Sequence, residues 1–145
     1  MKLKVILSKI IAVSLIFTIL FCASGCNPTT ENNAKQIDID LTKMSETMVY
    51  SQVTNMLNNP DEYIGKTVKA KGPCSVYTSS NTGKTYYSVI FKDSTACCNQ
   101  YIEFVLEENN YPKNGDNIEI VGVFDTYYEG KNLYCQLSSA QLITP

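Results

Sequence analysis

The sequence predicts a mainly β fold, a small closed or partly closed barrel of five strands preceded by one helix. Three observations predict it. Apolar residues recur at every second position in five segments after residue 66, the period of a strand with one buried face. Clusters of Asn, Asp, Gly and Ser separate these segments as turns. A helical period occurs ahead of the first strand. Five short strands in this order favour a barrel over an open sheet.

The helix is expected between about Lys43 and Asn58. Thr42 or Ser45 can cap its start. Pro60 ends it, because the residue before a proline is pushed out of the helical region. The apolar residues of this segment recur at helical spacing: Met48 or Val49, Val53, Met56 and Leu57.

The first three strands follow in order. Residues alternate between apolar and polar from Val68 to Val76, and the Ser/Asn/Gly cluster at 79–83 then turns the chain. A second strand has Tyr87, Val89 and Phe91 on one face and ends at 93–95. A third strand runs through Ile102, Phe104 and Leu106.

The last two strands form a hairpin. The segment 107–116 is too rich in Asn, Pro and Gly for a helix and is expected to be a loop. Ile118, Ile120 and Phe124 mark the fourth strand. The Glu-Gly-Lys-Asn segment 129–132 turns it into the fifth, which carries Leu133, Cys135 and Leu137.

Two motifs resemble bacterial OB-fold domains. The run from Tyr63 to Gly72 resembles the "Y-x-G-K-x-V-x-x-x-G" entry into their first strand, and the run from Gly115 to Gly122 resembles their "G-D-x-V-x-V-x-G" fourth strand. The resemblance spans about residues 44–143 and implies an OB-fold-like barrel. The placement of a helix ahead of the barrel resembles that in bacterial lipoproteins with a tRNA_anti-like OB domain. This resemblance implies that the helix closes one end of the barrel. The segment 96–100 resembles a double-cysteine stretch in an OB-like domain of bacterial membrane proteins, which brings no known activity.

The N-terminal region has the layout of a secretory signal. Three lysines precede an uncharged apolar run, and small residues lead into Cys26. Ala23-Ser24-Gly25-Cys26 resembles a bacterial lipobox, although the pattern prefers Leu at the position of Ala23. The resemblance implies that residues 1–25 are a lipoprotein signal peptide and that Cys26 receives a diacylglyceryl group, which is enough for stable attachment. An ordinary secretory signal and a retained membrane anchor are the alternatives.

These features divide the chain into three parts. Residues 1–25 are the expected signal peptide, 26–42 a flexible polar tether and 43–145 the OB-fold-like domain. The expected location is therefore extracytoplasmic, lipid-anchored to the bacterial cell membrane. Exclusive use of Lys over Arg, with many Asn, Tyr and Ile, is typical of AT-rich coding and suggests a Gram-positive bacterium.

Composition excludes several kinds of site. The chain has no His, so Ser-His-Asp and Cys-His catalysis and His-ligated metals are excluded. It has no Arg, and without residues 1–25 it carries nine Lys against 14 acidic residues, a net charge of −5. That charge disfavours binding to a phosphate backbone. The carboxylates are scattered, so we expect no enzyme and no cofactor.

Without residues 1–25, four cysteines remain besides Cys26, and three interpretations of them stay open. Cys97 and Cys98 could form two structural disulfides with Cys74 and Cys135, as an oxidising compartment and an even number favour. All four could be free thiols that pack as small apolar residues. A metal site or redox-active dithiol is the third possibility. The spacing lacks the two C-x-x-C knuckles of a strong zinc signature, so no metal ligands are assigned.

Tyrosines are the candidate binding residues. In OB barrels the ligand face is formed by the second and third strands and is flanked by the loops after the first and fourth. Aromatic rings there can stack on bases or sugars without charge. Alternatively, tyrosine simply suits half-exposed strand positions. The tyrosines expected at such a face are Tyr77, Tyr86, Tyr101, Tyr127 and Tyr128.

Three functions follow from these observations, in order of preference. The first is a lipid-anchored, non-catalytic binding module whose partner is an envelope protein or glycan. The second is a thiol-based redox or metal-binding lipoprotein that uses Cys97 and Cys98. The third is oligonucleotide binding, which the negative charge disfavours.

Overall fold

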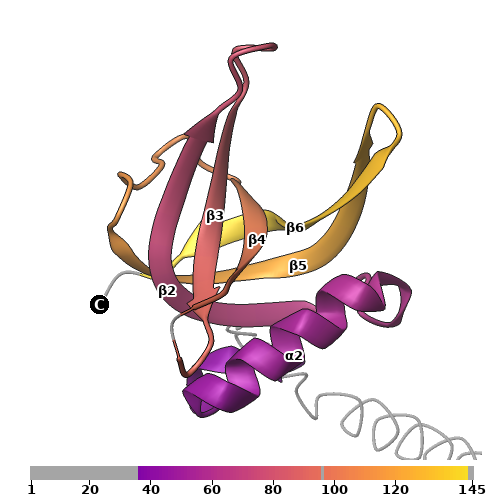
Figure 1. Ribbon diagram of the computed structural model, residues 1–145, viewed down its shortest axis with the longest axis vertical. Helices are drawn as coiled ribbons and strands as arrows, with labels where there is room; N and C mark the ends of the chain where they lie inside the picture. The colour runs from indigo at the N-terminus through magenta and orange to yellow at the C-terminus, as the bar shows by residue number, and fades with distance from the viewer. Residues whose placement is uncertain (1–35, 96, 144–145) are drawn as a thin grey trace, which may run out of the picture. The chain divides into compact units, whose positions relative to one another are not determined.

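A computed structural model describes residues 36–95 and 97–143. The expected signal peptide, Cys26 and most of the expected tether therefore lie outside the described residues. The elements are shown in Figure 1. They are strands β1 (Ile39–Asp40), β2 (Thr67–Thr78), β3 (Thr85–Lys92), β4 (Asn99–Leu106), β5 (Asn117–Glu129) and β6 (Asn132–Leu142), helix α2 (Glu46–Asn58), and the 3-10 turns η2 (Leu41–Lys43) and η3 (Pro60–Glu62).

The strands form one mixed sheet of six strands in the order β1-β2-β3-β4-β6-β5, and β5 also pairs with β2. The five long strands are thus joined in a closed ring of hydrogen bonds. β4 and β6 run parallel, whereas the other neighbours in the ring are antiparallel. The prediction of a mainly β fold with five main strands and a preceding helix is confirmed, and β1 is an additional short strand.

Strand β2 closes the ring because it pairs on both of its edges. Its first half, Thr67–Pro73, pairs with β5, and its second half, Cys74–Thr78, pairs with β3. Gly72 lies at the change of partner. A Cβ atom there would stand 2.6 Å from the backbone oxygen of Ile90, so only glycine allows the two strands to approach this closely. Figure 1 shows β2 curving through this region.

Helix α2 covers one end of the ring, away from the tips of the β2–β3 and β5–β6 hairpins (Figure 1). Val53 and Met56 are its fully buried residues, in agreement with the predicted apolar positions. The helix ends at Asn58, ahead of Pro60, as the sequence predicts, and η3 begins at Pro60. Among the described residues, no helix combines the length and the apolar character that a membrane span requires.

The folded unit begins earlier than the predicted boundary at residue 43. Ile39 and Asp40 pair in parallel with Val68 and Lys69 of β2. The Asp38 side chain accepts a hydrogen bond of 2.7 Å from the backbone N–H of Thr67. The last residues of the expected tether, 38–42, therefore join the domain, because Ile39 is half-buried in its pairing with β2 and Leu41 is buried in the core.

The core fills the ring and the space beneath α2. Alternate residues of the long strands point into it, so their neighbours point outward. The buried residues include Val68, Ala70 and Cys74 of β2, Val89 and Phe91 of β3, Ile102, Phe104 and Leu106 of β4, Ile118, Ile120 and Phe124 of β5, and Leu137 and Ala140 of β6.

Candidate functional site

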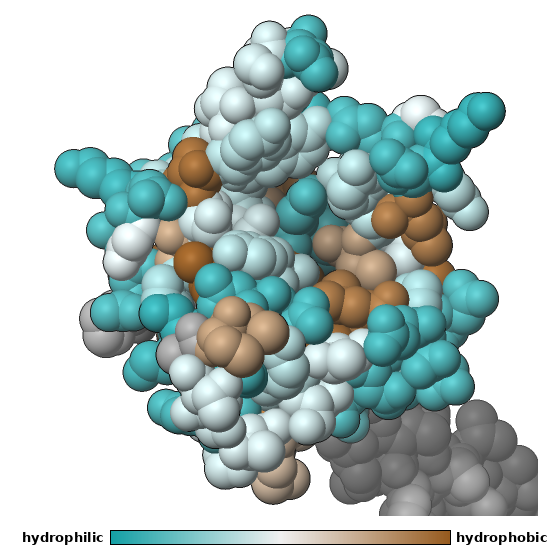
Figure 2. All heavy atoms as spheres, viewed as in Figure 1, coloured by the Kyte–Doolittle hydropathy of each residue, from teal (hydrophilic) through white to brown (hydrophobic). Residues whose placement is uncertain are grey.

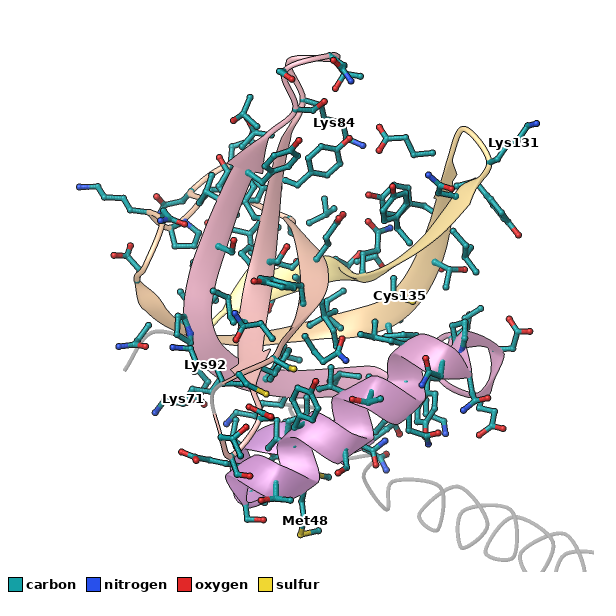
Figure 3. All side chains as sticks on the ribbon, in the orientation of Figure 1. Met48, Lys71, Lys84, Lys92, Lys131 and Cys135 are labelled. Atoms are coloured by element: carbon teal, nitrogen blue, oxygen red, sulfur yellow. The ribbon has the colours of Figure 1, made fainter. Side chains whose placement is uncertain are left out.

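A groove of about 440 Å³ lies along β3 and β4 and extends to β5 and β6. Figure 2 shows the surface hollowed between the β2–β3 and β5–β6 hairpins, with hydrophilic residues along its rim. In Figure 3, Lys84 lies near the tip of the β2–β3 hairpin, on the side that faces the other hairpin. The groove is lined by Lys84, Thr85, Tyr86, Tyr87, Glu103, Phe104, Val105, Tyr111, Tyr127 and Gln136.

Strand alternation explains why the polar side chains converge. Tyr127 and Glu129 are two residues apart, so both point outward from β5, opposite to the buried Phe124. Glu103 of β4 pairs with Gln136 of β6, which brings its side chain toward the same face. We call the five residues Lys84, Tyr86, Glu103, Tyr127 and Glu129 the tyrosine–glutamate network.

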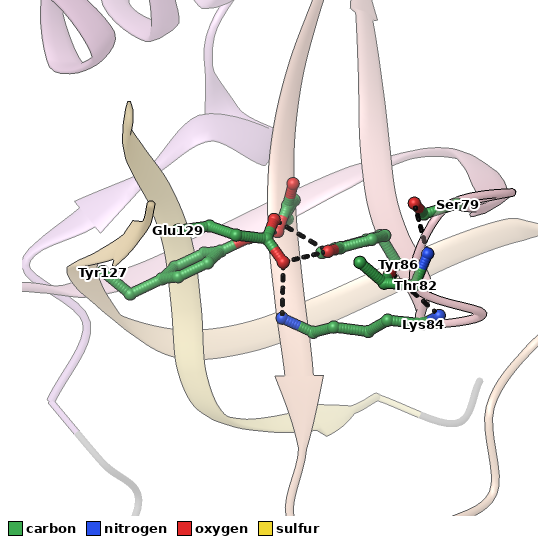
Figure 4. Close-up of polar contacts among 7 residues, drawn as sticks. Ser79, Thr82, Lys84, Tyr86, Tyr127 and Glu129 are labelled. Atoms are coloured by element: carbon green, nitrogen blue, oxygen red, sulfur yellow. Dashed lines mark hydrogen bonds and ion pairs between the residues drawn. The ribbon is translucent and has the colours of Figure 1, made fainter. Parts of the chain in front are cut away.

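Glu129 is the centre of one half of this network (Figure 4). The Tyr86 hydroxyl donates to the Glu129 carboxylate, with distances of 2.6 and 2.8 Å to its two oxygens. The Lys84 ammonium lies 3.9 Å from Glu129 Oε1, and 4.6 and 5.2 Å from the ring centroids of Tyr86 and Tyr127. The cation therefore binds two aromatic faces and one carboxylate.

Tyr127 and Glu103 form the other half. The Tyr127 hydroxyl donates to Glu103 Oε2 at 2.6 Å. The ring of Tyr134 stacks on that of Tyr127, with centroids 5.5 Å apart and planes at 22°. Burial and the hydrogen bond to Glu103 raise the pKa of Tyr127. Tyr127 is thus fixed both by its ring and by its hydroxyl.

The second phenol gives a testable pH dependence. The hydrogen bond to Glu129 raises the pKa of Tyr86 to about 12, against about 10 for an unperturbed tyrosine. The folded state therefore holds this proton more tightly. Its contribution to stability is complete below pH 10 and is lost as the pH rises to 12. Spectrophotometric titration of tyrosinate should show a step for Tyr86, which is identified because Tyr86→Phe lacks it. In Glu129→Gln this step should move to lower pH. The loop variant Glu108→Gln should leave it unchanged, and equal curves for Glu129→Gln and wild type would contradict the assignment.

The structure brings some of the predicted tyrosines to the groove and not others. Tyr86 and Tyr127 line it. Tyr77 stands at its edge, 63% exposed, and stacks on Tyr86 at 6.2 Å. Tyr101 lies on the same face of β4 as Glu103 but does not line the groove. Tyr128 is 73% exposed and points to the opposite side of β5 from Tyr127, because the two residues are adjacent in a strand.

Sequence reasoning missed the charged members of the network. The carboxylates appeared scattered, yet Glu103 and Glu129 each bind a tyrosine of the groove. The two-residue spacing of Tyr127 and Glu129 was a usable signal, because it places both side chains on one face. Tyr134 pairs directly with Tyr127 across the β5–β6 hairpin. Two tyrosines at opposite positions of a predicted hairpin were a second usable signal, because their side chains lie on the same face.

All four cysteines in the described residues are free thiols. Disulfides from Cys97 and Cys98 to Cys74 and Cys135, one of the three interpretations left open by the sequence, are not found among the described residues. Cys74 is 1% exposed and lies opposite Val89, whereas Cys97 and Cys98 are exposed beyond the end of β3. Figure 3 shows Cys135 far from Lys92, the last residue of β3. Cys97 and Cys98 instead lie against each other and against Asp93.

Comparison with known proteins gives little guidance. No family model matches the chain, and no curated protein matches its sequence. Among solved structures, it is similar to a crystal structure of a Klebsiella pneumoniae lipoprotein to which nucleic-acid binding has been ascribed. The two are 21% identical over 64% of this chain and 83% of that one, with a TM-score of 0.41. A likeness this low leaves both fold and function to be inferred from the residues of this chain.

Proposed function

We propose that this protein is a lipid-anchored, extracytoplasmic OB-fold binding protein without catalytic activity, whose groove holds an envelope glycan. The observation that carries the proposal is the tyrosine–glutamate network. It presents aromatic faces beside carboxylate oxygens at one end of a hollowed sheet face.

The cyclic strand order supports the OB-fold assignment. Counting only the long strands, the ring runs first, second, third, fifth, fourth and back to the first, with the third and fifth parallel. In OB barrels, ligands bind to the second and third strands between the loops that follow the first and fourth. Here those strands are β3 and β4, and those loops are the β2–β3 and β5–β6 turns. The groove lies on this face.

The chemistry of the network favours an uncharged, hydroxyl-rich ligand. Two carboxylates against one lysine make the network acidic, which repels a phosphate backbone. Tyr77, which is 63% exposed and stacks on Tyr86, offers a ring face for stacking on the apolar side of a sugar. Carboxylate oxygens accept hydrogen bonds from sugar hydroxyls. A protein segment that inserts side chains between the two hairpins is the alternative ligand.

Binding without turnover is consistent with the residues of the groove. The chain has no histidine to act as a general base near neutral pH. Glu103 and Glu129 already accept hydrogen bonds from phenols that position them. The lipobox-like segment ending at Cys26 supports attachment to the outer face of the cell membrane, which brings the groove to the cell wall.

Co-sedimentation of the full-length protein with purified, insoluble cell-wall glycan tests the proposal. Tyr127→Ala should weaken binding at least about tenfold, because removal of a central aromatic anchor costs about 2 kcal/mol. Tyr128→Ala is the matched control, since this neighbouring side chain lies on the other side of the strand, and it should bind as the wild type does.

Two results would contradict parts of the proposal. Equal binding by the Tyr127 and Tyr128 variants, or no binding of glycan by the wild type, would exclude the glycan and leave a protein partner. Release of soluble sugar during the incubation would show catalysis. The thiol-based alternative concerns a different part of the molecule, the turn after β3, and is compatible with a ligand in the groove.

A further inference from the structure

We propose that Asp93, Cys97 and Cys98 form a binding site for a thiophilic metal ion, Zn²⁺ in particular. The three side chains gather in the turn that joins β3 to β4, outside the groove described above. Their ligand atoms all lie within 4.8 Å of one another. The two sulfur atoms are 3.2 Å apart, and Cys97 Sγ is 3.2 Å from Asp93 Oδ2.

These separations are close to those of a metal-bound set. Zinc binds thiolate sulfur at about 2.3 Å and carboxylate oxygen at about 2.1 Å, so tetrahedral angles place two ligand atoms roughly 3.5–3.8 Å apart. Lengthening the Cys97 Sγ–Cys98 Sγ and Cys97 Sγ–Asp93 Oδ2 separations by about half an ångström each brings them to this geometry. Three protein ligands leave the fourth position open for water or an external ligand.

The turn holds Asp93 in place for this role. Its Oδ1 accepts hydrogen bonds from the backbone N–H groups of Cys97 and Cys98 at 3.0 and 3.5 Å. Its own N–H donates to the Cys98 carbonyl at 3.2 Å. One carboxylate oxygen therefore fixes the turn while the other, Oδ2, faces the thiols. The Thr95 hydroxyl donates to that second oxygen at 2.8 Å and orients it.

Metal binding releases protons from the two thiols. In the metal-free state the Cys97 thiol donates to Asp93 Oδ2 and lies 3.2 Å from Cys98 Sγ. Binding one divalent ion replaces both thiol protons, and two protons leave for each ion bound.

The donor set selects a soft or borderline ion. Two sulfurs and one oxygen suit Zn²⁺ or Cu⁺, whereas Ca²⁺ and Mg²⁺ require oxygen ligands throughout. Lys71 and Lys92, labelled in Figure 3, line a second pocket that also contains Glu46 and Asp93. The two lysines balance the two carboxylates there, so metal binding depends on the metal–sulfur bonds.

A bond between the two thiols is the competing state. Adjacent Cα atoms are about 3.8 Å apart across a trans peptide, whereas disulfides usually span about 4.4–6.8 Å. This mismatch disfavours oxidation of the pair to a mutual disulfide. A chelated ion has no such requirement, because it lies between the two sulfurs.

Cobalt(II) titration of the reduced, full-length protein under anaerobic conditions tests the site. We expect one Co²⁺ per chain, with a thiolate-to-cobalt charge-transfer band that one equivalent of Zn²⁺ removes. Zn²⁺ binding to the metal-free protein should release two protons in weakly buffered solution. Absence of the band, or no saturation at one equivalent, would overturn the proposal.

Single variants assign the ligands. Cys97→Ser and Cys98→Ser should each reduce the charge-transfer band and weaken Co²⁺ binding at least about tenfold. Asp93→Asn should weaken Co²⁺ binding by a similar factor but retain the band, because both thiolates remain. Asn keeps an oxygen that can accept the backbone hydrogen bonds of the turn. Cys135→Ser is the control for a thiol elsewhere and should match the wild type. An equal effect of Cys135→Ser would place the metal elsewhere. Tyr127→Ala should leave metal binding unchanged, which separates this site from the groove.

Discussion

Replacing Phe124 with alanine should lower the free energy of unfolding by about 3–5 kcal/mol. Phe124 has no exposed surface and is the largest fully buried side chain among the described residues. Its ring meets that of Tyr63 edge to face, with centroids 6.2 Å apart. Alanine would leave a cavity where strand β5 meets the segment that follows α2, and close-packed neighbours on rigid strands can fill it only in part.

Urea unfolding followed by circular dichroism measures this loss. Tyr128→Ala is the matched control, because it removes an aromatic ring from an exposed position of the same strand and should change stability by less than about 0.5 kcal/mol. Similar losses for the two variants would show that β5 is not oriented with Phe124 inward. Since Tyr127 points outward only if Phe124 points inward, that result would also remove the structural basis of the groove.

The secondary structure could be predicted from local sequence patterns. Alternation marked the five long strands, helical spacing identified Val53 and Met56 as the buried face of α2, and the composition of 107–116 excluded a helix between β4 and β5. Each of these patterns lies within a short segment, where the buried side chains and the turn residues are themselves the physical cause of the element.

The site could be predicted only in part, because its contacts join distant residues. Tyr86 and Glu129 are 43 positions apart, and Glu103 and Tyr127 are 24 apart. These pairs meet because β2 closes the ring with β5 and because β4 runs parallel to β6. Both pairings depend on the whole sheet, and no single segment of sequence contains them. The turn at Asp93 is local, but its carboxylate was interpreted as a strand breaker and not as a partner of the two thiols.

The start of the domain was placed too late for a related reason. Residues 38–42 contain few apolar positions, which is typical of a tether in isolation. Their burial depends on pairing with Val68 and Lys69, nearly thirty residues further along the chain. Pairing with a neighbouring strand therefore gives order to a segment whose own composition does not require it.

Leu41→Ala should reveal how much this short segment contributes, with an expected loss of about 2–5 kcal/mol in the free energy of unfolding. Leu41 is 2% exposed and belongs to the main core, although it lies within the stretch that composition assigns to a tether. Its backbone is held in place by β1 on one side and by a turn capped by Asp40 on the other. A side chain fixed in this way leaves an unfilled cavity when truncated.

Ile37→Ala is the matched control, because this apolar side chain precedes β1 and is 38% exposed, against 2% for Leu41, so its truncation should cost clearly less. Denaturant unfolding of both variants gives the comparison. If Leu41→Ala lowered the free energy of unfolding by no more than Ile37→Ala does, residues 38–42 would be part of the tether and not of the domain. The expected difference would show that this short segment anchors the start of the domain to β2 through the parallel pairing of β1 and the buried Leu41 side chain.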